Sequence, residues 1–385
     1  MSDFHLHIIS LDVPWPADYG GVMDIFYKIK QLHKAGIRIH LHCFSNGRPP
    51  QDELDNYCEE VLYYQRKNFF QALPLRLPYM VASRNNEALL RNLQKDAYPI
   101  LMEGIQCSYL LHNDALKGRK IFLRLHNTEF LYYEKLAGHE TNFIKRWYFL
   151  NESRLLKKYE LEISDKAPIL ALSRSDINVY KKLFSIFSIH FLPAFTPWDK
   201  VTSLEGKGKY CLYHGNLGIN ENERAVEWLL EHVFSKTDIP FIVAGKRPSE
   251  ALEKKISQYP NCSLIENPTN IEMQDLVIQA QVNVLPSFNN TGVKLKLLNA
   301  LYNGRHCLVN KATIEGAELE GTCSFAEEPQ LFLQKTIRLF ETAFTADDIL
   351  LRQQALWEVY NNGQNAAKLM QLMDISPNNK TSQNN

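Results

Sequence analysis

The strongest constraint on the fold of this chain is a regular alternation between short apolar segments and longer amphipathic segments. Residues 5–11 (HLHIISL) have the composition of a buried strand, residues 22–36 have helical periodicity, and residues 37–44 form the next strand-like segment. Further strand-like segments, with helical segments in the same series, lie at 99–104, 120–126 and 168–173. Continuous apolar strands are typical of parallel sheets, which need crossover connections. The pattern therefore predicts an α/β fold in which helices cover both faces of a parallel sheet.

A second series of the same kind begins near residue 209. Its strand-like segments lie at 209–215, 240–246, 262–267, 281–287 and 306–310, with helical segments between them. The intervening stretch FLPAFTPWDKVTSLEGKGK is rich in proline, glycine and lysine, which is typical of an interdomain linker. We therefore predict an N-terminal domain over 1–195, a linker over 196–208, a C-terminal domain over 209–345, a helical segment over 346–374 that packs back towards the N-terminal domain, and a disordered tail over 375–385.

Composition argues against several functional classes. Lys plus Arg and Asp plus Glu both number 43, so no net positive field favours nucleic acid. The 7 cysteines include no C-x-x-C pair, which argues against a disulfide framework or a structural zinc site and fits a reducing compartment. The N-terminal residues lack the features of a signal peptide, and no run approaches about 18 apolar residues. We therefore expect a soluble cytoplasmic protein that does not bind nucleic acid.

Residues that follow the predicted strands are the first candidates for function, because ligands of open parallel sheets bind beyond the carboxyl ends of the strands. In the N-terminal domain, Gly20 and Gly21 precede a helix, where bare backbone can approach a phosphate or a sugar hydroxyl. His126 ends a strand, and Asn127 and Glu129 follow it closely. The alternatives are a tight glycine turn and a structural histidine. The fingerprint G-x-G-x-x-G is absent, which disfavours a nicotinamide-dependent dehydrogenase.

Two lysines in the C-terminal domain occupy an electrostatically unfavourable position. The periodicity from 293 to 302 predicts a helix that ends at Gly304, and it places Lys294 and Lys296 in the first turn. The free N–H groups of a helix N-terminus already carry about half a positive charge, so cations are disfavoured there. A bound anion would resolve the conflict.

Other strand ends of the C-terminal domain supply similar groups. Gly215 follows one predicted strand, and Lys246 and Arg247 follow the next. A charge pair on one loop is usually solvated surface, but several such loops near a helix N-terminus favour a diphosphate ligand. No Asp-x-Asp sequence is present to hold a divalent cation beside a diphosphate, so we predict a site with no metal and no cofactor.

The order and content of these segments resemble the GT-B glycosyltransferases, particularly the bacterial family 4 (glycosyltransferase group 1) type. The resemblance rests on YGGVMDIFYKIKQLHKAGIRIHLHCF, RLHNTEFLYYEKLA, LALSRSD, YHGNLGINENERAVEWLL, FIVAGKRP and VLPSFNNTGVKLKLLNALYNGRHCLVNKATIEG, which span residues 1 to about 350. It implies two Rossmann-like domains that face a central cleft. The C-terminal domain would hold a UDP-, GDP- or dTDP-linked sugar, and the N-terminal domain would hold the acceptor. It also implies metal-independent transfer of a hexose-like sugar with retention of anomeric configuration.

The resemblance assigns roles to individual residues. His126, beside the transferred sugar, and Lys294 are the implied catalytic residues. Asn127 and Glu129 would lie on the acceptor side. The implied donor-binding residues are Gly21, Gly215, Asn216, Lys246, Arg247, Thr291, Gly292, Val293, Lys294, Lys296 and Asn299.

The sequence departs from the family pattern at two places. The segment NLGINEN (216–222) lacks the Arg and Lys that the family often carries for the diphosphate, and the four cations named above are candidate substitutes. The last family motif commonly has two glutamates, and alignment places Thr291 and Asn299 at their positions. Asn299 could still bond a ribose hydroxyl, but it loses a charge-assisted bond worth roughly 1 kcal/mol.

The leading hypothesis is therefore a retaining glycosyltransferase that acts on a glycan or glycolipid acceptor in cell-envelope polysaccharide or glycoconjugate assembly. The alternatives are a nucleotide-sugar epimerase of the same fold and a non-catalytic, glycosyltransferase-like partner subunit. Residues 61–80 and 142–160 mix aromatic side chains with cations, which suits peripheral contact with the cytoplasmic face of the inner membrane. The competing interpretation is that these aromatic side chains form ordinary core.

Overall fold

The computed structural model describes residues 4–45, 47–72, 76–186, 188–289 and 292–375, which divide into two compact units. Unit 1 comprises residues 1–197 and 360–385, and unit 2 comprises residues 198–359. Each unit is built around one parallel sheet with interleaved helices, so the predicted pair of parallel α/β domains is confirmed. Within the described ranges, no helix combines the length and the apolar character needed to cross a membrane.

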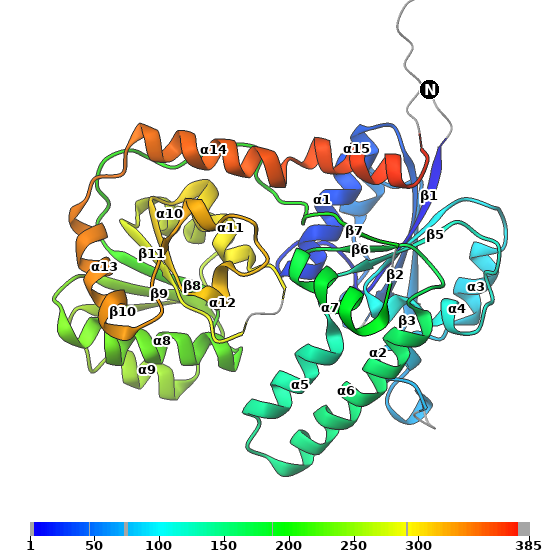
Figure 1. Cartoon of the computed structure of the whole chain (residues 1–385), viewed down its shortest axis with the longest axis horizontal. Helices are drawn as coiled ribbons and strands as arrows, with labels where there is room; N and C mark the ends of the chain where they lie inside the picture. Colours follow the sequence, from blue (N-terminus) through cyan, green and yellow to red (C-terminus); the bar gives the residue numbers. More distant parts are fainter. Residues whose placement is uncertain (1–3, 46, 73–75, 187, 290–291, 376–385) are drawn as a thin grey trace, which may run out of the picture. The chain divides into compact units, whose positions relative to one another are not determined.

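The sheet of unit 1 has seven strands in the order β3-β2-β1-β4-β5-β6-β7, and all neighbours are parallel (Figure 1). The strands are β1 (His5–Ser10), β2 (Arg38–Ser45), β3 (Glu60–Gln65), β4 (Ile100–Glu103), β5 (Ile121–Leu125), β6 (Ile169–Ala171) and β7 (Ile189–Phe191). The chain order reverses between β1 and β4. In an open parallel sheet, the carboxyl ends of the strands at such a reversal border the ligand site.

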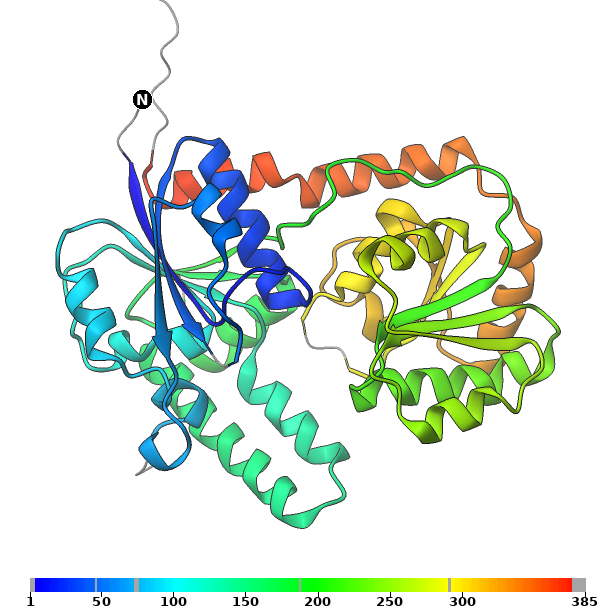
Figure 2. The same ribbon diagram turned by 180° about the vertical axis from the view of Figure 1, so that it is seen from behind.

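Helices cover both faces of this sheet, as the sequence predicts. They are α1 (Gly20–Lys34), α2 (Tyr79–Ala82), α3 (Glu87–Leu93), α4 (Tyr109–His112), α5 (Glu129–His139), α6 (Phe143–Ile163), α7 (Arg174–Phe184) and α15 (Asn362–Leu372). The buried side chains of α1 and α15 form one apolar core with the sheet, and those of α3, α4, α6 and α7 form another. Helices α5 and α6 pack against each other as a pair that extends from the sheet (Figures 1 and 2).

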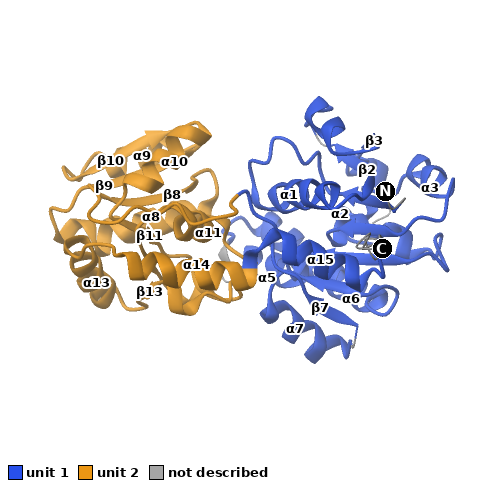
Figure 3. Cartoon of the chain, turned by 90° about the horizontal axis from the view of Figure 1, so that it is seen from above, with its two compact units in different colours: residues 1–197, 360–385 blue, residues 198–359 orange. Residues whose placement is uncertain are grey.

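The C-terminal segment and the linker differ from the sequence-based prediction. The segment predicted as one helical stretch over 346–374 contains two helices, α14 (Ala346–Tyr360) and α15, because Asn361 caps the second one by accepting from the Gln364 backbone N–H. Only α15 packs on α1, and α14 up to Val359 belongs to unit 2 (Figure 3). Of the predicted tail, Ile375 is buried in the core of unit 1, and residues 376–385 lie outside the described ranges.

Most of the predicted linker also belongs to unit 2. Thr202 donates its backbone N–H to the Tyr302 carbonyl oxygen over 2.7 Å, and Gly206 forms a β-bridge with Phe344. Backbone pairing therefore holds this segment on unit 2, and the proline- and glycine-rich composition reflects turns rather than a free connection.

The sheet of unit 2 has six strands in the order β10-β9-β8-β11-β12-β13, again all parallel. The strands are β8 (Cys211–Asn216), β9 (Phe241–Lys246), β10 (Cys262–Glu266), β11 (Val282–Leu285), β12 (His306–Val309) and β13 (Ser324–Phe325). The other helices of the unit are α8 (Asn220–His232), α9 (Glu250–Ile256), α10 (Asn270–Gln279), α11 (Leu295–Asn303), α12 (Lys311–Ile314) and α13 (Pro329–Glu341). The chain order reverses between β8 and β11, so their carboxyl ends border the expected ligand site of this unit.

Candidate functional site

In unit 1, His126 and Gly21 come together beyond the carboxyl ends of the central strands. His126 directly follows β5 and is 9% exposed, and Gly21 lies in the first turn of α1. A methyl group built on Gly21 would lie 3.8 Å from His126 Nδ1 and 3.5 Å from the Tyr19 ring. The two residues that the sequence singles out separately are therefore neighbours in space.

A carboxylate orients the His126 ring. His126 Nε2 lies 3.0 Å from Glu103 Oε2 at the end of β4. Burial opposes ionisation of Glu103, but the Lys28 ammonium and the hydrogen bond to His126 outweigh it and keep the pKa of Glu103 below its usual range. Because an ionised carboxylate can only accept, His126 donates Nε2–H to Glu103, and its Nδ1 is directed to the side of the ring where Gly21 lies.

Glu103 is one member of a buried ion network. Lys28 Nζ donates to Glu103 Oε1 over 2.7 Å and to Asp24 Oδ2 over 3.0 Å. Arg124 in β5 donates to both oxygens of Asp24 over 3.2 Å. Burial alone would raise the pKa of Asp24, but the Arg124 and Lys28 cations outweigh it and hold that pKa well below its usual range. Two carboxylates thus balance two cations, and the network fixes the atoms behind His126.

This network does not fit a metal ion, although Asp24, Glu103 and His126 place potential ligand atoms within 4.8 Å of one another. The Lys28 ammonium already bonds to both carboxylates, and Arg124 bonds to Asp24 as well. A divalent cation would have to displace Lys28 and would create an excess of buried positive charge. We therefore assign the cluster to positioning of His126.

The two predicted acceptor-side residues differ in exposure. Asn127 is half-buried, whereas Glu129 at the start of α5 is buried. Burial raises the pKa of Glu129 to about 7, although hydrogen bonds from Asn127 and Gln106 favour its ionised form. Glu129 therefore faces protein groups, and the direct acceptor contact predicted for it stays a prediction.

In unit 2, Lys296 has an unusual environment for a lysine. Its Nζ donates to the Tyr213 hydroxyl oxygen over 2.7 Å and to Asn222 Oδ1 over 3.0 Å, and it lies 4.5 Å from the centre of the Tyr213 ring. Both hydrogen-bond partners are neutral. Burial, together with the charge of Lys294, lowers the pKa of Lys296 to about 7, whereas Glu221 acts in the opposite direction. The ammonium is thus desolvated, and no carboxylate of the described residues pairs with it directly.

The helix that carries Lys296 begins later than the sequence predicts. Helix α11 starts at Leu295, so Lys294 occupies the N-cap and only Lys296 lies in the first turn, because Val293 and Gly292 belong to the preceding loop. Gly292 has a φ of +64°, which an L side chain adopts only with strain. In this helix, whose residues are all described, the Lys294 side chain does not cap the first-turn N–H groups, and the first turn has no acidic residue. Its N–H groups and two lysines therefore gather positive charge at this end of the helix.

Two further donor-side predictions concern residues near this helix. Thr291 lies outside the described residues, so its predicted role stays untested. Asn299 accepts a hydrogen bond from Asn303 Nδ2 over 2.8 Å at its Oδ1 atom, and Asn303 in turn accepts from Thr202. Asn299 is therefore held in a side-chain network of its own unit, and a ribose contact remains a prediction.

The loops after β8 and β9 are joined to each other. Leu217 and Gly218 donate their backbone N–H groups to the Lys246 carbonyl oxygen over 2.8 and 3.2 Å. A methyl group on Gly245 would lie 2.0 Å from the Gly215 carbonyl oxygen, so the close approach of the two strands requires glycine at 245. Asn216 is bonded to the Lys296 cluster, because its carbonyl oxygen accepts from Asn222 Nδ2 over 2.9 Å.

The cations on these loops do not all converge. Lys246 and Arg247 are exposed, and Arg247 has a φ of +56° with its backbone N–H donated to Asn267 Oδ1. Within the described part of unit 2, no recorded hydrogen bond or ion pair joins either side chain to Lys296. The structure thus links Gly215, Asn216 and Lys296, and places Lys246 and Arg247 at the neighbouring strand end.

Sequence reasoning missed the residues that support each site. The network behind His126 was signalled by charged residues inside apolar strands, Arg124 in IFLRL and Glu103 in ILME, and by an Asp–Lys pair at i, i+4 in α1. Tyr213 had no such signal, because a tyrosine within an apolar strand is ordinary core.

Comparisons with known proteins agree with this architecture. Residues 208–342 match the family model described as "Glycosyl transferases group 1". An "Uncharacterized 44.6 kDa protein in cps region" from Klebsiella pneumoniae is 27% identical over 333 residues, which cover 82% of this chain and 84% of that protein.

Solved structures with the same fold span both units. The sucrose-phosphate synthase of Thermosynechococcus elongatus has a TM-score of 0.72 at 13% identity and covers 96% of this chain and 98% of its own. A variant of S. aureus TarM, solved in complex with Fondaparinux, alpha-GlcNAc-glycerol and UDP, has a TM-score of 0.66 at 11% identity and covers 97% of this chain and 100% of its own. The chain therefore has the GT-B fold of these structures, and the match to the group 1 glycosyl transferase model lies in its second unit.

Proposed function

We propose that the chain is a retaining glycosyltransferase that moves a hexose-like sugar from a nucleotide-sugar donor to a glycan or glycolipid acceptor. The observation that carries the proposal is the desolvated ammonium of Lys296, which has neutral partners at the cationic end of α11. A diphosphate bound there would supply negative charge beside Lys296 and would accept from first-turn N–H groups of the helix. The group 1 family match over residues 208–342 supports a nucleotide-sugar as the source of that diphosphate.

Catalysis in this proposal is electrostatic. Lys294, Lys296 and the N-terminus of α11 stabilise the charge that develops on the leaving diphosphate, with Lys246 and Arg247 as further candidates for donor contact. No protein nucleophile and no metal ion is proposed. The acceptor hydroxyl attacks the anomeric carbon directly, on the face from which the diphosphate departs, so the configuration is retained. The bond from the anomeric carbon to the diphosphate oxygen breaks as the new bond forms, and the hydroxyl proton passes to the departing phosphate oxygen.

His126 is proposed to orient the transferred sugar. Glu103 holds its Nε2–H, so Nδ1 accepts from a sugar hydroxyl when the ring is neutral. The absence of a side chain on Gly21 leaves room beside that atom. The ion network behind Glu103 keeps the ring in one orientation, which is the pre-organisation that a positioned sugar requires.

The class of acceptor is inferred from two observations. The Klebsiella pneumoniae relative is described as lying in a cps region, which supports a role in cell-envelope polysaccharide assembly. Several aromatic side chains that the sequence left open as core are exposed, with Phe70 82% and Trp147 69% exposed. We therefore also propose that unit 1 makes peripheral contact with the cytoplasmic membrane face, where a lipid-linked acceptor would be presented.

A thermal-shift screen against UDP-, GDP- and dTDP-sugars tests the donor proposal and names the nucleotide. We expect one nucleotide class to raise the melting temperature, and we expect Lys294→Ala to reduce turnover with that donor by about tenfold to a thousandfold. The matched control is Lys254→Ala, which removes an exposed lysine of α9 in the same unit. Unchanged turnover in Lys294→Ala would remove Lys294 from the mechanism.

The same screen separates the alternative functions. Stabilisation by no nucleotide sugar would favour the non-catalytic partner subunit. Formation of an epimerised sugar nucleotide in the absence of any acceptor would instead identify an epimerase. Metal independence is tested by adding EDTA to the transfer assay, where unchanged turnover is the expected result.

A further inference from the structure

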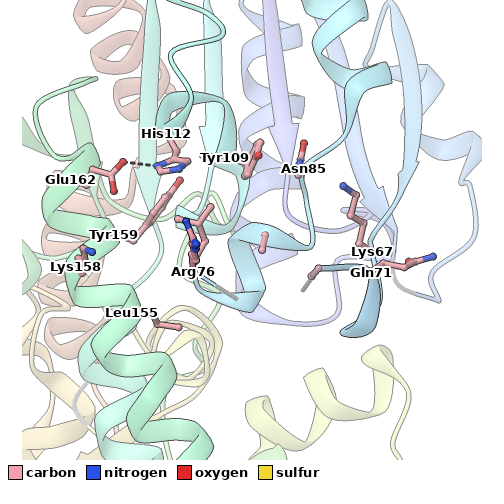
Figure 4. Close-up of a pocket in the computed structure, with 13 residues that line it drawn as sticks. Lys67, Gln71, Arg76, Asn85, Tyr109, His112, Leu155, Lys158, Tyr159 and Glu162 are labelled. Atoms are coloured by element: carbon pink, nitrogen blue, oxygen red, sulfur yellow. Dashed lines mark hydrogen bonds and ion pairs between the residues drawn. The ribbon is translucent and has the colours of Figure 1, made fainter. Parts of the chain in front are cut away.

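Unit 1 contains a cavity that the proposed transfer reaction does not use. It has a volume of about 480 Å³ and lies between helix α6, helix α4 and the segment that follows β3. Figure 4 shows Lys158, Tyr159 and Glu162 on the α6 wall, with Lys67 and Gln71 from the segment after β3 on another wall. Arg76, which precedes α2, also lines the cavity.

The charges that line this cavity are not balanced. Lys67, Arg76 and Lys158 supply three cations. The one carboxylate, Glu162, is paired with His112, whose Nδ1 lies 2.5 Å from Glu162 Oε1. Within the described ranges, none of the three cationic side chains forms a salt bridge.

Other lysines of the unit show that such pairing is available elsewhere. Lys166, which lies near the same end of α6, pairs with Asp114 over 3.1 Å, and Lys120 pairs with Asp374 over 2.7 Å. A cavity lined by three cations without salt bridges therefore favours an anionic ligand, and a phosphate group is an anion that both Arg and Lys side chains bind.

The face of α6 that lines the cavity continues into exposed apolar side chains. At 3.6 residues per turn, Ile144, Trp147, Leu155, Lys158 and Glu162 lie on one face of the helix. The last three of these line the cavity, whereas Ile144 is 62% exposed and Trp147 is 69% exposed. Trp147 lies about 16 Å from Lys158 along the axis at 1.5 Å per residue.

The wall of the cavity opposite α6 also continues into an exposed aromatic side chain. Gln71 and Ala72, which line it, belong to a short 3₁₀ helix (Phe70–Ala72) that begins with an aromatic residue 82% exposed. Lys145 and Arg146 stand beside the exposed apolar residues of α6 and are themselves exposed. Exposed aromatic side chains next to cations are typical of surfaces that contact the headgroup region of an anionic bilayer.

We propose that this cavity binds the phosphate headgroup of an anionic membrane lipid while the exposed residues of α6 and of the 3₁₀ helix enter the bilayer interface. Lys67, Arg76 and Lys158 supply positive charge to the anionic headgroup from separate walls of the cavity, and Trp147, Ile144 and Phe70 contact the acyl and headgroup boundary. The inference rests on the proposed membrane contact of unit 1, and it names the site at which that contact becomes specific for a phosphate.

The test measures co-sedimentation of the full chain with vesicles of phosphatidylcholine alone and of equimolar phosphatidylcholine and phosphatidylglycerol. We expect the combined variant Lys67→Ala, Arg76→Ala and Lys158→Ala to bind the mixed vesicles at least about tenfold more weakly than the unsubstituted chain. The matched control is Lys34→Ala, Lys95→Ala and Lys117→Ala, which removes three exposed lysines of unit 1 from outside the cavity and changes the net charge equally. We expect this control to bind at least several-fold more tightly than the cavity variant.

Each outcome separates the cavity from the membrane contact. Equal losses in the two triple variants would overturn the cavity site and leave a general electrostatic contact. A chain that binds neither kind of vesicle would overturn the membrane contact and the lipid site together. If such a chain binds soluble glycerol phosphate, and only the cavity variant loses that binding, the ligand of the cavity is a soluble phosphate. The thermal-shift screen on the same preparations reports donor binding in unit 2 independently, so failure of the proposed transfer function is recognised separately.

Discussion

The two units differ in how they balance charge near the carboxyl ends of their central strands. In unit 1, Asp24, Lys28, Glu103 and Arg124 are buried and neutralise one another, and they support His126 from behind. In unit 2, Lys296 is desolvated, but its hydrogen-bond partners are the neutral groups of Tyr213 and Asn222. The first arrangement is complete within the protein, whereas in the second no carboxylate of the part of the chain that the structure describes contacts the ammonium directly.

This difference separates groups that shape a site from groups that bind a ligand. A buried charge that is paired inside the protein holds its neighbours in one orientation, and its removal lowers the free energy of unfolding. A desolvated charge without an opposite charge costs stability in the free protein and recovers that cost when a ligand binds. We therefore expect substitutions in the unit 1 network to lower the free energy of unfolding, and substitutions at Lys296 to weaken ligand binding.

The largest expected effect is on the stability of unit 1. Asp24→Ala removes a carboxylate that both Arg124 and Lys28 contact, so an uncompensated charge stays buried and the free energy of unfolding should fall by about 3–5 kcal/mol. Urea-induced unfolding measures this loss. The control is Asp18→Ala, which breaks a partly exposed pair with Arg48 and should cost less than about 1 kcal/mol. Similar losses in the two variants would contradict the role assigned to the network.

An intermediate effect is expected at Lys296, and on binding rather than on folding. Lys296→Met should weaken binding of the preferred nucleoside diphosphate by about tenfold to a hundredfold, because charge-assisted bonds to phosphate are lost. The melting temperature of the free protein should stay the same or rise, because a desolvated charge is removed. Lys254→Met provides the control for both measurements. A marked fall in melting temperature would show that Lys296 is structural, as Asp24 is.

The same lysine predicts a pH dependence of opposite sign for folding and for binding. The pKa of Lys296 is lowered to about 7 in the folded protein, so above that pH the unfolded chain binds more protons than the folded protein. The contribution of Lys296 to the free energy of unfolding therefore rises with pH until the pKa of the unfolded chain is reached. An anionic ligand favours the protonated form, so affinity should fall as pH rises above 7 and binding should take up protons near pH 8. Calorimetry in two buffers of different ionisation enthalpy measures that uptake, which should disappear in Lys296→Met.

The smallest expected effect concerns Asn299. Asn299→Glu restores the acidic residue that the family commonly carries, and it should tighten nucleotide binding by roughly 1 kcal/mol, about fivefold, through a charge-assisted bond to the ribose. Asn299→Gln serves as the control because it lengthens the side chain without adding charge. If Glu and Gln at this position bind the nucleotide equally well, Asn299 does not contact the ribose.

Much of the fold was predictable because it follows from local periodicity. Continuous apolar runs such as Ile121–Leu125 specify buried parallel strands, and Gly304 ends α11 where the sequence predicts. The helical stretch over 346–374 was less predictable. Its periodicity continues across Asn361, and only the capping hydrogen bond from Gln364 shows that a second helix begins there.

The candidate site was predictable only in part, for a related reason. The sequence pattern places His126 directly after a strand and Gly21 and Lys296 at the start of the helix that follows one, and these segments gather at one edge of a parallel sheet. Lys294 and Lys296 look equivalent in the sequence, but one caps α11 and the other contacts Tyr213. The direction of a side chain depends on where its helix begins, to within one residue.

The sequence by itself determined the two parallel α/β units, the strand ends that carry glycines and cations, and the excess of positive charge near α11. Only the tertiary structure decided which charges are compensated. Asp24, Glu103 and Arg124 lie on three separate elements, and strand order brings them within hydrogen-bonding distance of shared partners. Pairing over such separations depends on the packing of the whole sheet, whereas strand and helix periodicity depends on residues within a few positions of one another.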